Sequence, residues 1–248
     1  MTRAAVAVGV FDGVHVGHRR VLHALRSAGT PRVVTIDPHP VSGTQLLCSL
    51  ERRLELLADE GVADIVVATP DAVPDAGNAV LVAGPGGVEL SRPPDVRVPL
   101  VEGVSSSLIR RLVAARELDH TARLLGRPFE LEGVVVEGEA RGRGLGFPTA
   151  NLAVQPGLLV PPNGIYAGAA LGRRAAVSIG VNPHYGGFER HVEAFVLDFE
   201  GDLYGKRLRV ELWGFLREEA AFASESELVA QIARDVEATR AAIRPGSA

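Results

Sequence analysis

Two oxygen-bearing side chains stand two residues apart near the middle of the chain, in the segment Pro148-Thr149-Ala150-Asn151. On an extended chain both side chains point to the same face, because successive residues of a strand alternate. A hydroxyl and an amide oxygen are hard, neutral ligands, which suit Mg²⁺ when its remaining ligands come from water and phosphate. For Thr149 and Asn151 alone, an ordinary Asn/Thr turn is the alternative interpretation.

A glycine- and arginine-rich stretch precedes this pair. It contains the residues Gly138, Arg141, Gly142, Arg143, Gly144 and Gly146. Closely spaced glycines with two cations predict a loop whose backbone wraps a polyphosphate. The stretch is not a Walker A loop, because no Gly-Lys-Ser/Thr follows, and it lacks the Rossmann glycine spacing.

A second chemical pattern lies near the N-terminus, in Gly9-Val10-Phe11-Asp12-Gly13-Val14-His15-Val16-Gly17-His18. Here a strand is expected to meet a helix, which is where ligands bind in open α/β sheets. The N–H groups of the helix N-terminus suit a phosphate. His15 and His18 share one face of the first turn and can donate hydrogen bonds to a phosphate in its transition state. Two partly buried structural histidines are the alternative.

Hydroxyl groups mark another helix start, in Val104-Ser105-Ser106-Ser107-Leu108-Ile109-Arg110. Ser105 or Ser106 is predicted to cap this helix, with Arg110 one turn in. The serines therefore form either part of a phosphate site or a simple capping motif. His39, in Asp37-Pro38-His39-Pro40, is expected to shape a loop.

The first half of the chain alternates strand and helix patterns. Strands are predicted at 5–10, 32–36, 64–68 and 79–83, and helices at 16–28 and 50–60. This alternation predicts a parallel sheet covered on both faces. The segment Thr69–Pro99 is rich in proline and glycine and contains no convincing helix. Two further helices are predicted, from Ser105 or Ser106 to Ala115 and over 118–125.

The second half changes period after Gly126. Strand-like runs at 129–137, 165–171, 175–180, 192–199 and 207–215 are separated by glycine-rich turns, which is typical of an antiparallel barrel or sandwich. A closing helix is predicted over 225–242, with an apolar stripe made of Leu228, Val229, Ile232, Val236 and Ile243. The prediction is therefore an α/β domain over 1–126 and an antiparallel β-barrel with a terminal helix over 127–248.

Composition restricts the class of protein. Hydrophobic residues make up 46% of the chain and the net charge is −4, which predicts a globular protein without a general nucleic-acid surface. The single cysteine, Cys48, excludes an internal disulfide and is expected to be buried. No signal peptide or membrane span is predicted, so a cytoplasmic location is expected. The sequence does not give the oligomeric state.

The chain resembles the prokaryotic bifunctional riboflavin kinase/FAD synthetases. His15-Val16-Gly17-His18 is similar to the motif of their nucleotidyltransferase domain, and the serine-rich helix start follows in the same order. The C-terminal half carries the Arg141–Leu152 run, Asn163-Gly164-Ile165-Tyr166, Ser178–Pro183, Val192–Asp198 and Asp202-Leu203-Tyr204-Gly205. The resemblance spans nearly the whole chain.

The resemblance implies ATP-dependent phosphorylation of riboflavin to FMN. Mg²⁺ would bridge Thr149, Asn151 and the ATP phosphates, and Glu193 would accept the proton of the 5′-hydroxyl of riboflavin. The loop 138–146, with Arg141 or Arg143, would hold the developing charge, and the ATP-binding residues would include Gly138, Gly142, Gly146 and Pro148. In the N-terminal domain, Gly9, Phe11, Asp12, His15, His18, Ser105, Ser106 and Arg110 would form an active or vestigial adenylyltransferase site. Asp198 and Arg217 are expected to be structural or peripheral.

The chain departs from this family in Thr69–Pro99. That segment replaces a helix and an aromatic segment that would contact flavin and nucleotide, and its nearest counterpart, Val80–Gly87, has no aromatic residue. We therefore expect a riboflavin kinase behind a shortened front domain. A bifunctional enzyme that also adenylylates FMN to FAD is the first alternative. A catalytically inactive flavin-binding module is the second, and the presence of Thr149, Asn151 and Glu193 disfavours it.

Overall fold

The computed structural model describes residues 3–84, 90–138, 141–184 and 187–246. The chain divides into two compact units. The first comprises Met1–Arg110 with Gly157–Leu159, and the second comprises Arg111–Pro156 with Val160–Ala248. The predicted domain boundary after Gly126 stays a prediction.

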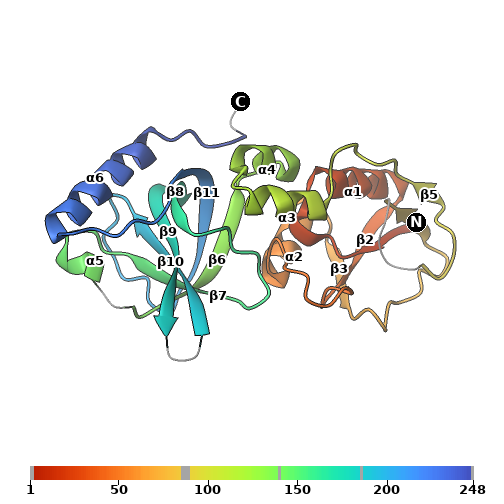
Figure 1. The fold of residues 1–248 in the computed structure, drawn as a ribbon. Coiled ribbons are helices and arrows are strands. Elements are labelled where there is room, and N and C mark those ends of the chain that lie inside the picture. Colours follow the sequence, from red (N-terminus) through yellow and green to blue (C-terminus); the bar gives the residue numbers. More distant parts are fainter. Residues whose placement is uncertain (1–2, 85–89, 139–140, 185–186, 247–248) are drawn as a thin grey trace. The chain divides into compact units, whose positions relative to one another are not determined.

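The first unit is built on a five-stranded parallel sheet in the order β3-β2-β1-β4-β5 (Figure 1). Its strands are β1 (Ala4–Gly9), β2 (Thr30–Ile36), β3 (Asp64–Ala68), β4 (Val80–Ala83) and β5 (Val96–Arg97). Its helical elements are the 3-10 turn η1 (Asp12–Val14), α1 (Val16–Ala28), α2 (Leu50–Asp59) and the start of α3 (Ser106–Ala114). The predicted parallel α/β architecture is confirmed.

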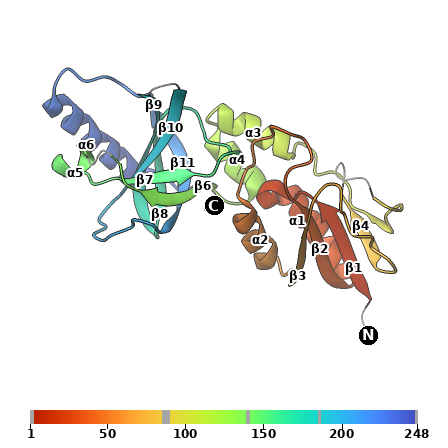
Figure 2. The same cartoon turned by 90° about the horizontal axis from the view of Figure 1, so that it is seen from below.

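The two faces of this sheet are covered differently. On one face, Ala5, Ala7 and Val33 pack with buried leucines of α1 and α2, and Cys48 is buried in the same cluster, as predicted. On the other face, Val6, Val34, Ile36 and Ala68 form a smaller cluster. These residues belong to β1, β2 and β3, which are labelled in Figure 2, and Val73, Ala76 and Ala79 from the segment between β3 and β4 pack against them. An extended segment therefore stands where α/β folds usually place a helix.

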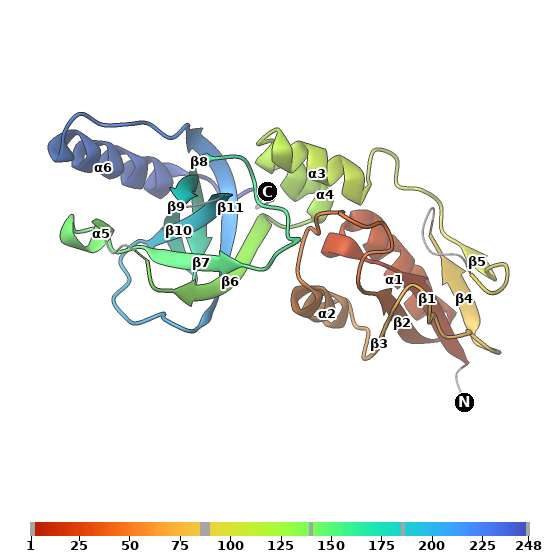
Figure 3. The same cartoon turned by 60° about the horizontal axis from the view of Figure 1, so that its bottom comes forward.

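The second unit is a closed antiparallel barrel in the order β10-β7-β6-β11-β8-β9 (Figure 3). Its strands are β6 (Phe129–Val136), β7 (Ala150–Val154), β8 (Gly164–Ala170), β9 (Arg173–His184), β10 (Gly187–Val196) and β11 (Arg207–Arg217). Alternate residues of these strands, among them Leu131, Val177, Ile179 and Val210, fill the interior. Of the two architectures that the strand pattern predicts, a barrel and a sandwich, the structure confirms the barrel. Strand β7 was not predicted, because its five residues directly follow the glycine-rich stretch.

Among the described residues, three complete helices belong to the second unit. Helix α4 (Leu118–Leu125) ends at Gly126 in the left-handed conformation and packs on β6 and β11. Helix α5 (Arg141–Gly144) is a single turn in the stretch predicted to be a loop. Helix α6 (Glu225–Ala241) packs against β8 and β9. Within the described ranges, no helix has the length and apolarity needed to cross a membrane.

The predicted apolar stripe of α6 is only partly correct. Leu228, Val229, Ile232 and Val236 are half-buried, but Ile243 lies beyond the helix end and is 84% exposed. The buried positions of α6 are the polar residues Asp235 and Thr239. Asp235 is buried because the guanidinium of Arg217 on β11 pairs with its carboxylate at 2.7 Å, and hydropathy patterns do not detect such a contact.

Candidate active site

The hydroxyl of Thr149 contacts the carboxylate of Glu193 at the start of β7, beside β10. Thr149 Oγ1 donates a hydrogen bond to Glu193 Oε2 at 2.9 Å, across 44 residues of sequence. The two side chains approach because β7 and β10 are antiparallel neighbours, with Asn151 directly opposite Glu193. Asn151 and Glu193 therefore come from two adjacent strands, and Thr149 directly precedes the first of them.

Asn151 is held close to the backbone of Gly138. A Cβ atom built on Gly138 would overlap the side-chain amide of Asn151 and lie 2.7 Å from its Oδ1. A glycine is therefore required here, because real Cβ atoms do not approach other heavy atoms so closely. The absence of a side chain at Gly138 lets the amide of Asn151 occupy the space beside Thr149.

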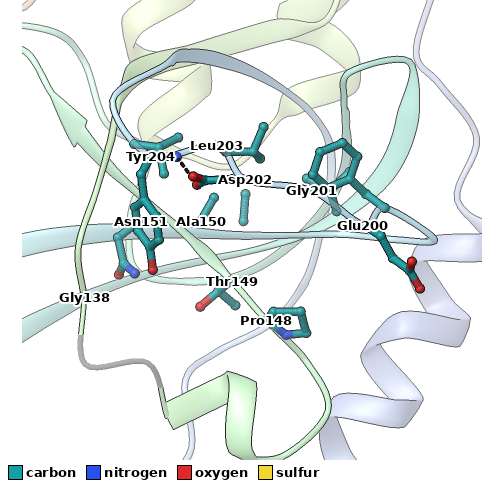
Figure 4. Close-up of a pocket in the computed structure, with 14 residues that line it drawn as sticks. Gly138, Pro148, Thr149, Ala150, Asn151, Glu200, Gly201, Asp202, Leu203 and Tyr204 are labelled. Carbon is teal, nitrogen blue, oxygen red and sulfur yellow. Dashed lines mark hydrogen bonds between the residues drawn. The ribbon is translucent and has the colours of Figure 1, made fainter.

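A cavity of about 600 Å³ opens beside these residues. Gly138, Pro148, Thr149 and Asn151 line one part of it, and the loop between β10 and β11, residues 199–204, lines another (Figure 4). Figure 4 shows Thr149, Ala150 and Asn151 in succession along the chain, in the same view as Asp202, Leu203 and Tyr204 of this loop. Glu193 is not among the residues that line the cavity, but its carboxylate accepts the hydrogen bond of a residue that does, Thr149. The volume is typical of a small-molecule site.

The turn before Pro148 is organised by the carbonyl of Gly142. This carbonyl accepts hydrogen bonds from the backbone N–H of Leu145 at 3.1 Å and of Phe147 at 2.8 Å. Gly146 has a φ of +86°, which glycine adopts without strain. The ring of Phe147 then packs edge-on against Phe195 of β10, with centroids 5.5 Å apart. The side chains of Arg141 and Arg143 lie outside what the structure describes, so their predicted phosphate contact stays a prediction.

The two histidines of the N-terminal motif are stacked. The ring centroids of His15 and His18 lie 3.7 Å apart, with 11° between the ring planes. His15 caps α1, because its Nδ1 accepts the backbone N–H of His18 at 3.3 Å. Burial, together with the neighbouring His15 and Arg53, lowers the pKa of His18 well below its ordinary value of 6.5. The imidazole of His18 is therefore neutral at neutral pH.

Asp12 ties three segments of this unit together. Its carboxylate accepts a hydrogen bond from the guanidinium of Arg110 at 2.5 Å and another from the backbone N–H of Leu47 at 2.8 Å. Its own carbonyl accepts the hydroxyl of Ser106 at 3.2 Å. Ser105 caps α3 by accepting the backbone N–H of Leu108, and burial raises the pKa of the Asp12 carboxyl, although Arg110 opposes the shift. The turn that carries Asp12 is thus joined to the serine-rich helix start, a contact that the sequence does not reveal.

Sequence reasoning missed Arg53, a fully buried arginine beside this site. Its guanidinium donates to the carbonyl of Ile36 at 2.9 Å and to the hydroxyl of Thr35 at 3.3 Å, and it pairs with Asp37. It contributes positive charge near Asp12 and His18. An isolated arginine in an amphipathic helix gives no sequence signal of burial, so only the fold reveals it.

The 199–204 loop is the second feature that the sequence did not assign to a site. The side chain of Asp202 accepts the backbone N–H of Tyr204 at 2.9 Å and so closes a turn. This turn presents Leu203 and Tyr204 to the cavity. The Asp-Leu-Tyr-Gly motif had been noted only as part of the family resemblance. Asp198 and Arg217, expected to be structural, pair with Arg240 and Asp235 of α6.

Two family models match the chain in separate stretches. The model described as riboflavin kinase matches residues 125–243, which contain the barrel. The model described as FAD synthetase matches residues 1–72 and so ends before the segment Thr69–Pro99 is complete. The matches correspond to the two patterns found in the sequence.

Curated relatives align with nearly the whole chain. The bifunctional riboflavin kinase/FMN adenylyltransferase of Escherichia coli K12 is 31% identical, over 93% of this chain and 90% of its own length. The protein of the same name from Listeria monocytogenes is 30% identical over 292 residues, which cover 95% of this chain and 91% of the relative. That aligned span exceeds the 248 residues of this chain, so the relative has residues that this chain lacks.

A solved structure shares the fold. It is titled as a macrolide-efflux protein from Streptococcus pneumoniae, and it superposes with a TM-score of 0.82 at 27% identity. The superposition covers 96% of this chain and 94% of the other. The arrangement of an α/β unit followed by a barrel is therefore found in another protein of similar length.

Proposed function

The chain belongs to the family of bifunctional riboflavin kinase/FMN adenylyltransferases, and we propose that its barrel phosphorylates riboflavin with ATP to give FMN and ADP. The observation that carries the proposal is the hydrogen bond between Thr149, which lines the cavity, and Glu193. It joins a hard oxygen ligand, suited to a metal–nucleotide complex, to a carboxylate able to accept a proton.

Magnesium fits the neutral oxygens of this site. Thr149 Oγ1 and Asn151 Oδ1 would hold the ion, and phosphate and water would complete its coordination. The close packing of Asn151 on Gly138 restricts where the amide can lie. Asn151 is therefore already positioned as a metal ligand before the nucleotide binds. When bound, Mg²⁺ supplies positive charge that offsets the charge of the transferring phosphoryl group.

Glu193 is the proposed general base. Its carboxylate takes the proton of the riboflavin 5′-hydroxyl as that oxygen forms a bond to the γ-phosphorus of ATP. The bond between the γ-phosphorus and its bridging oxygen breaks, and ADP leaves with the electron pair. The hydrogen bond from Thr149 holds the carboxylate next to a residue that lines the cavity. Backbone N–H groups of the 138–146 loop would hold the phosphates.

The cavity provides room for the nucleotide. Apolar side chains, among them Val135, Val196 and Leu203, line it away from Thr149, and Tyr204 adds an aromatic ring. If the adenine ring of ATP packs against these side chains, the phosphates of ATP extend toward Thr149 and Asn151. The proposal therefore places the nucleotide on the cavity side of Thr149 and the acceptor hydroxyl on the Glu193 side.

Adenylylation of FMN to FAD is the second candidate function, located in the first unit. The stacked His15 and His18 and the contact between Asp12 and Arg110 favour it. The absence of aromatic residues from Val80–Gly87 opposes it, although Pro85–Gly87 lie outside the described residues. We propose that the unit retains the phosphate-side residues but lacks a complete flavin pocket. A cytoplasmic location stays a prediction.

Replacing Glu193 with glutamine tests the proposed base. Glutamine keeps the size of the side chain but cannot take the proton, so we expect Glu193→Gln to lower kcat for FMN formation by about 10²-fold or more. The measurement is the initial rate of FMN formation at saturating riboflavin and ATP. Glu237→Gln, at an exposed position of α6, serves as the control and should retain the full rate. Near-normal turnover of Glu193→Gln rejects the role.

A further inference from the structure

A histidine and a glutamate converge beside the proposed base. His191 lies two residues before Glu193 on β10, so both side chains project from the same face of the strand. The intervening Val192 and the next residue, Ala194, are buried in the barrel. His191 and Glu193 therefore both stand on the outer surface of the barrel wall.

Gly180 on β9 makes room for this convergence. It pairs directly with His191. A Cβ atom at Gly180 would lie 2.5 Å from Cε1 and 2.7 Å from Nε2 of His191, and it would overlap Oε1 of Glu219. The imidazole of His191 and the carboxylate of Glu219 therefore both lie close to the Cα atom of Gly180. A residue with a side chain at position 180 would displace them.

Both side chains have unused hydrogen-bonding capacity in the part of the chain that the structure describes. The Nδ1 atom of His191 is shielded from water and has no partner there. Glu219 follows β11 and is exposed, and its carboxylate accepts no hydrogen bond from the described residues. A shielded polar atom without a partner is costly, and a ligand hydroxyl would satisfy it.

The spacing from Glu193 matches the acceptor substrate. Two residues along a strand span about 7 Å, which is comparable to the length of a short polyol chain. If the terminal hydroxyl of such a chain lies at Glu193, its inner hydroxyls reach His191 and Glu219. We propose that these two residues bind the inner hydroxyls of the ribityl chain and thereby position the reacting hydroxyl, an inference that rests on the proposed kinase function.

Two acceptors separate this role from a general structural one. Riboflavin carries inner hydroxyls, whereas a flavin with a 5-hydroxypentyl chain keeps only the reacting one. We expect His191→Phe and Glu219→Gln each to lower kcat/KM for riboflavin by about tenfold, the scale of one lost hydrogen bond. The same variants should change kcat/KM for the hydroxypentyl analogue by less than about twofold, because that substrate makes no such bond.

Controls and a binding measurement keep the test decisive. His23→Phe and Glu237→Gln change exposed residues of α1 and α6 and should leave both substrates unaffected. An equal loss for both acceptors, or no loss for riboflavin, overturns the proposal. Riboflavin affinity of the same proteins, followed by quenching of flavin fluorescence, provides a readout that needs no turnover. A wild-type chain that binds riboflavin but forms no FMN would refute the kinase function, whereas unchanged affinity in both variants would refute the positioning role.

Discussion

At the scale of single residues, the barrel site depends on close approaches that only certain residue types permit. Thr149 reaches Glu193 because it directly precedes the strand that pairs with β10. Asn151 takes its place because Gly138 has no side chain.

The residues of the first unit make a testable prediction about acid stability. His18 is buried with its pKa well below 6.5, first because burial disfavours the charged ring and second because of His15 and Arg53. Just below pH 6.5, His18 therefore binds a proton in the unfolded chain but not in the folded unit. Stability contributed by neutral His18 is present above pH 6.5 and is lost as the pH falls below that value.

Thermal unfolding of the full chain between pH 7.5 and 5 measures this effect. Relative to the variant His18→Gln, the wild type should lose up to about 1.4 kcal/mol per pH unit below pH 6.5, the cost of one excluded proton. His23→Gln, at an exposed position on the same helix, should follow the wild type. Parallel pH profiles for His18→Gln and the wild type would show that His18 titrates normally.

At the scale of elements, α6 is fixed to the barrel largely by polar pairs. Arg217 of β11 forms a bidentate contact with Asp235, with N–O distances of 2.9 and 2.7 Å. Gln231 donates to the same carboxylate at 2.8 Å. The guanidinium of Arg174 donates to the carbonyls of Thr239 and Ala242 at the end of the helix. The apolar face of the helix is only half-buried, so these pairs hold its orientation.

Removing the central carboxylate should therefore weaken the second unit. We expect Asp235→Ala to lower the free energy of unfolding by about 3 kcal/mol, because it leaves Arg217 partly buried without its partner. Glu237→Ala, two residues along the same helix but exposed, should change it by less than about 0.5 kcal/mol. Urea denaturation of the full chain measures both. A loss below 1 kcal/mol for Asp235→Ala would mean that the apolar contacts alone hold α6.

The elements also show how far the sequence could be interpreted. Strands β1 to β4 and helices α1 and α2 were predictable because their apolar patterns are regular. Strand β5, with two residues, and β7, with five, were missed because they are short and lie in regions rich in proline or glycine. The pairing of Thr149 with Glu193 could be suspected only from the family resemblance, since strand neighbours 44 residues apart leave no local pattern. Arg53, His191 and Glu219 were missed because their significance arises only from the fold.

At the scale of the whole molecule, the two units differ in how complete their sites are. The barrel unit brings Thr149, Asn151 and Glu193 together beside a cavity. The first unit brings the residues suited to phosphate together, but an extended segment covers the second face of its sheet. The relatives are named for two activities, and we propose the first of them for this chain.

The product formed from riboflavin tests that assignment most directly. Purified chain is incubated with riboflavin, ATP and Mg²⁺, and the flavins are separated by chromatography over a long time course. We expect that riboflavin is converted to FMN, with one ADP formed for each FMN, and that no FAD accumulates. Appearance of FAD would show a complete adenylyltransferase site in the first unit, and unchanged riboflavin would contradict the kinase assignment itself.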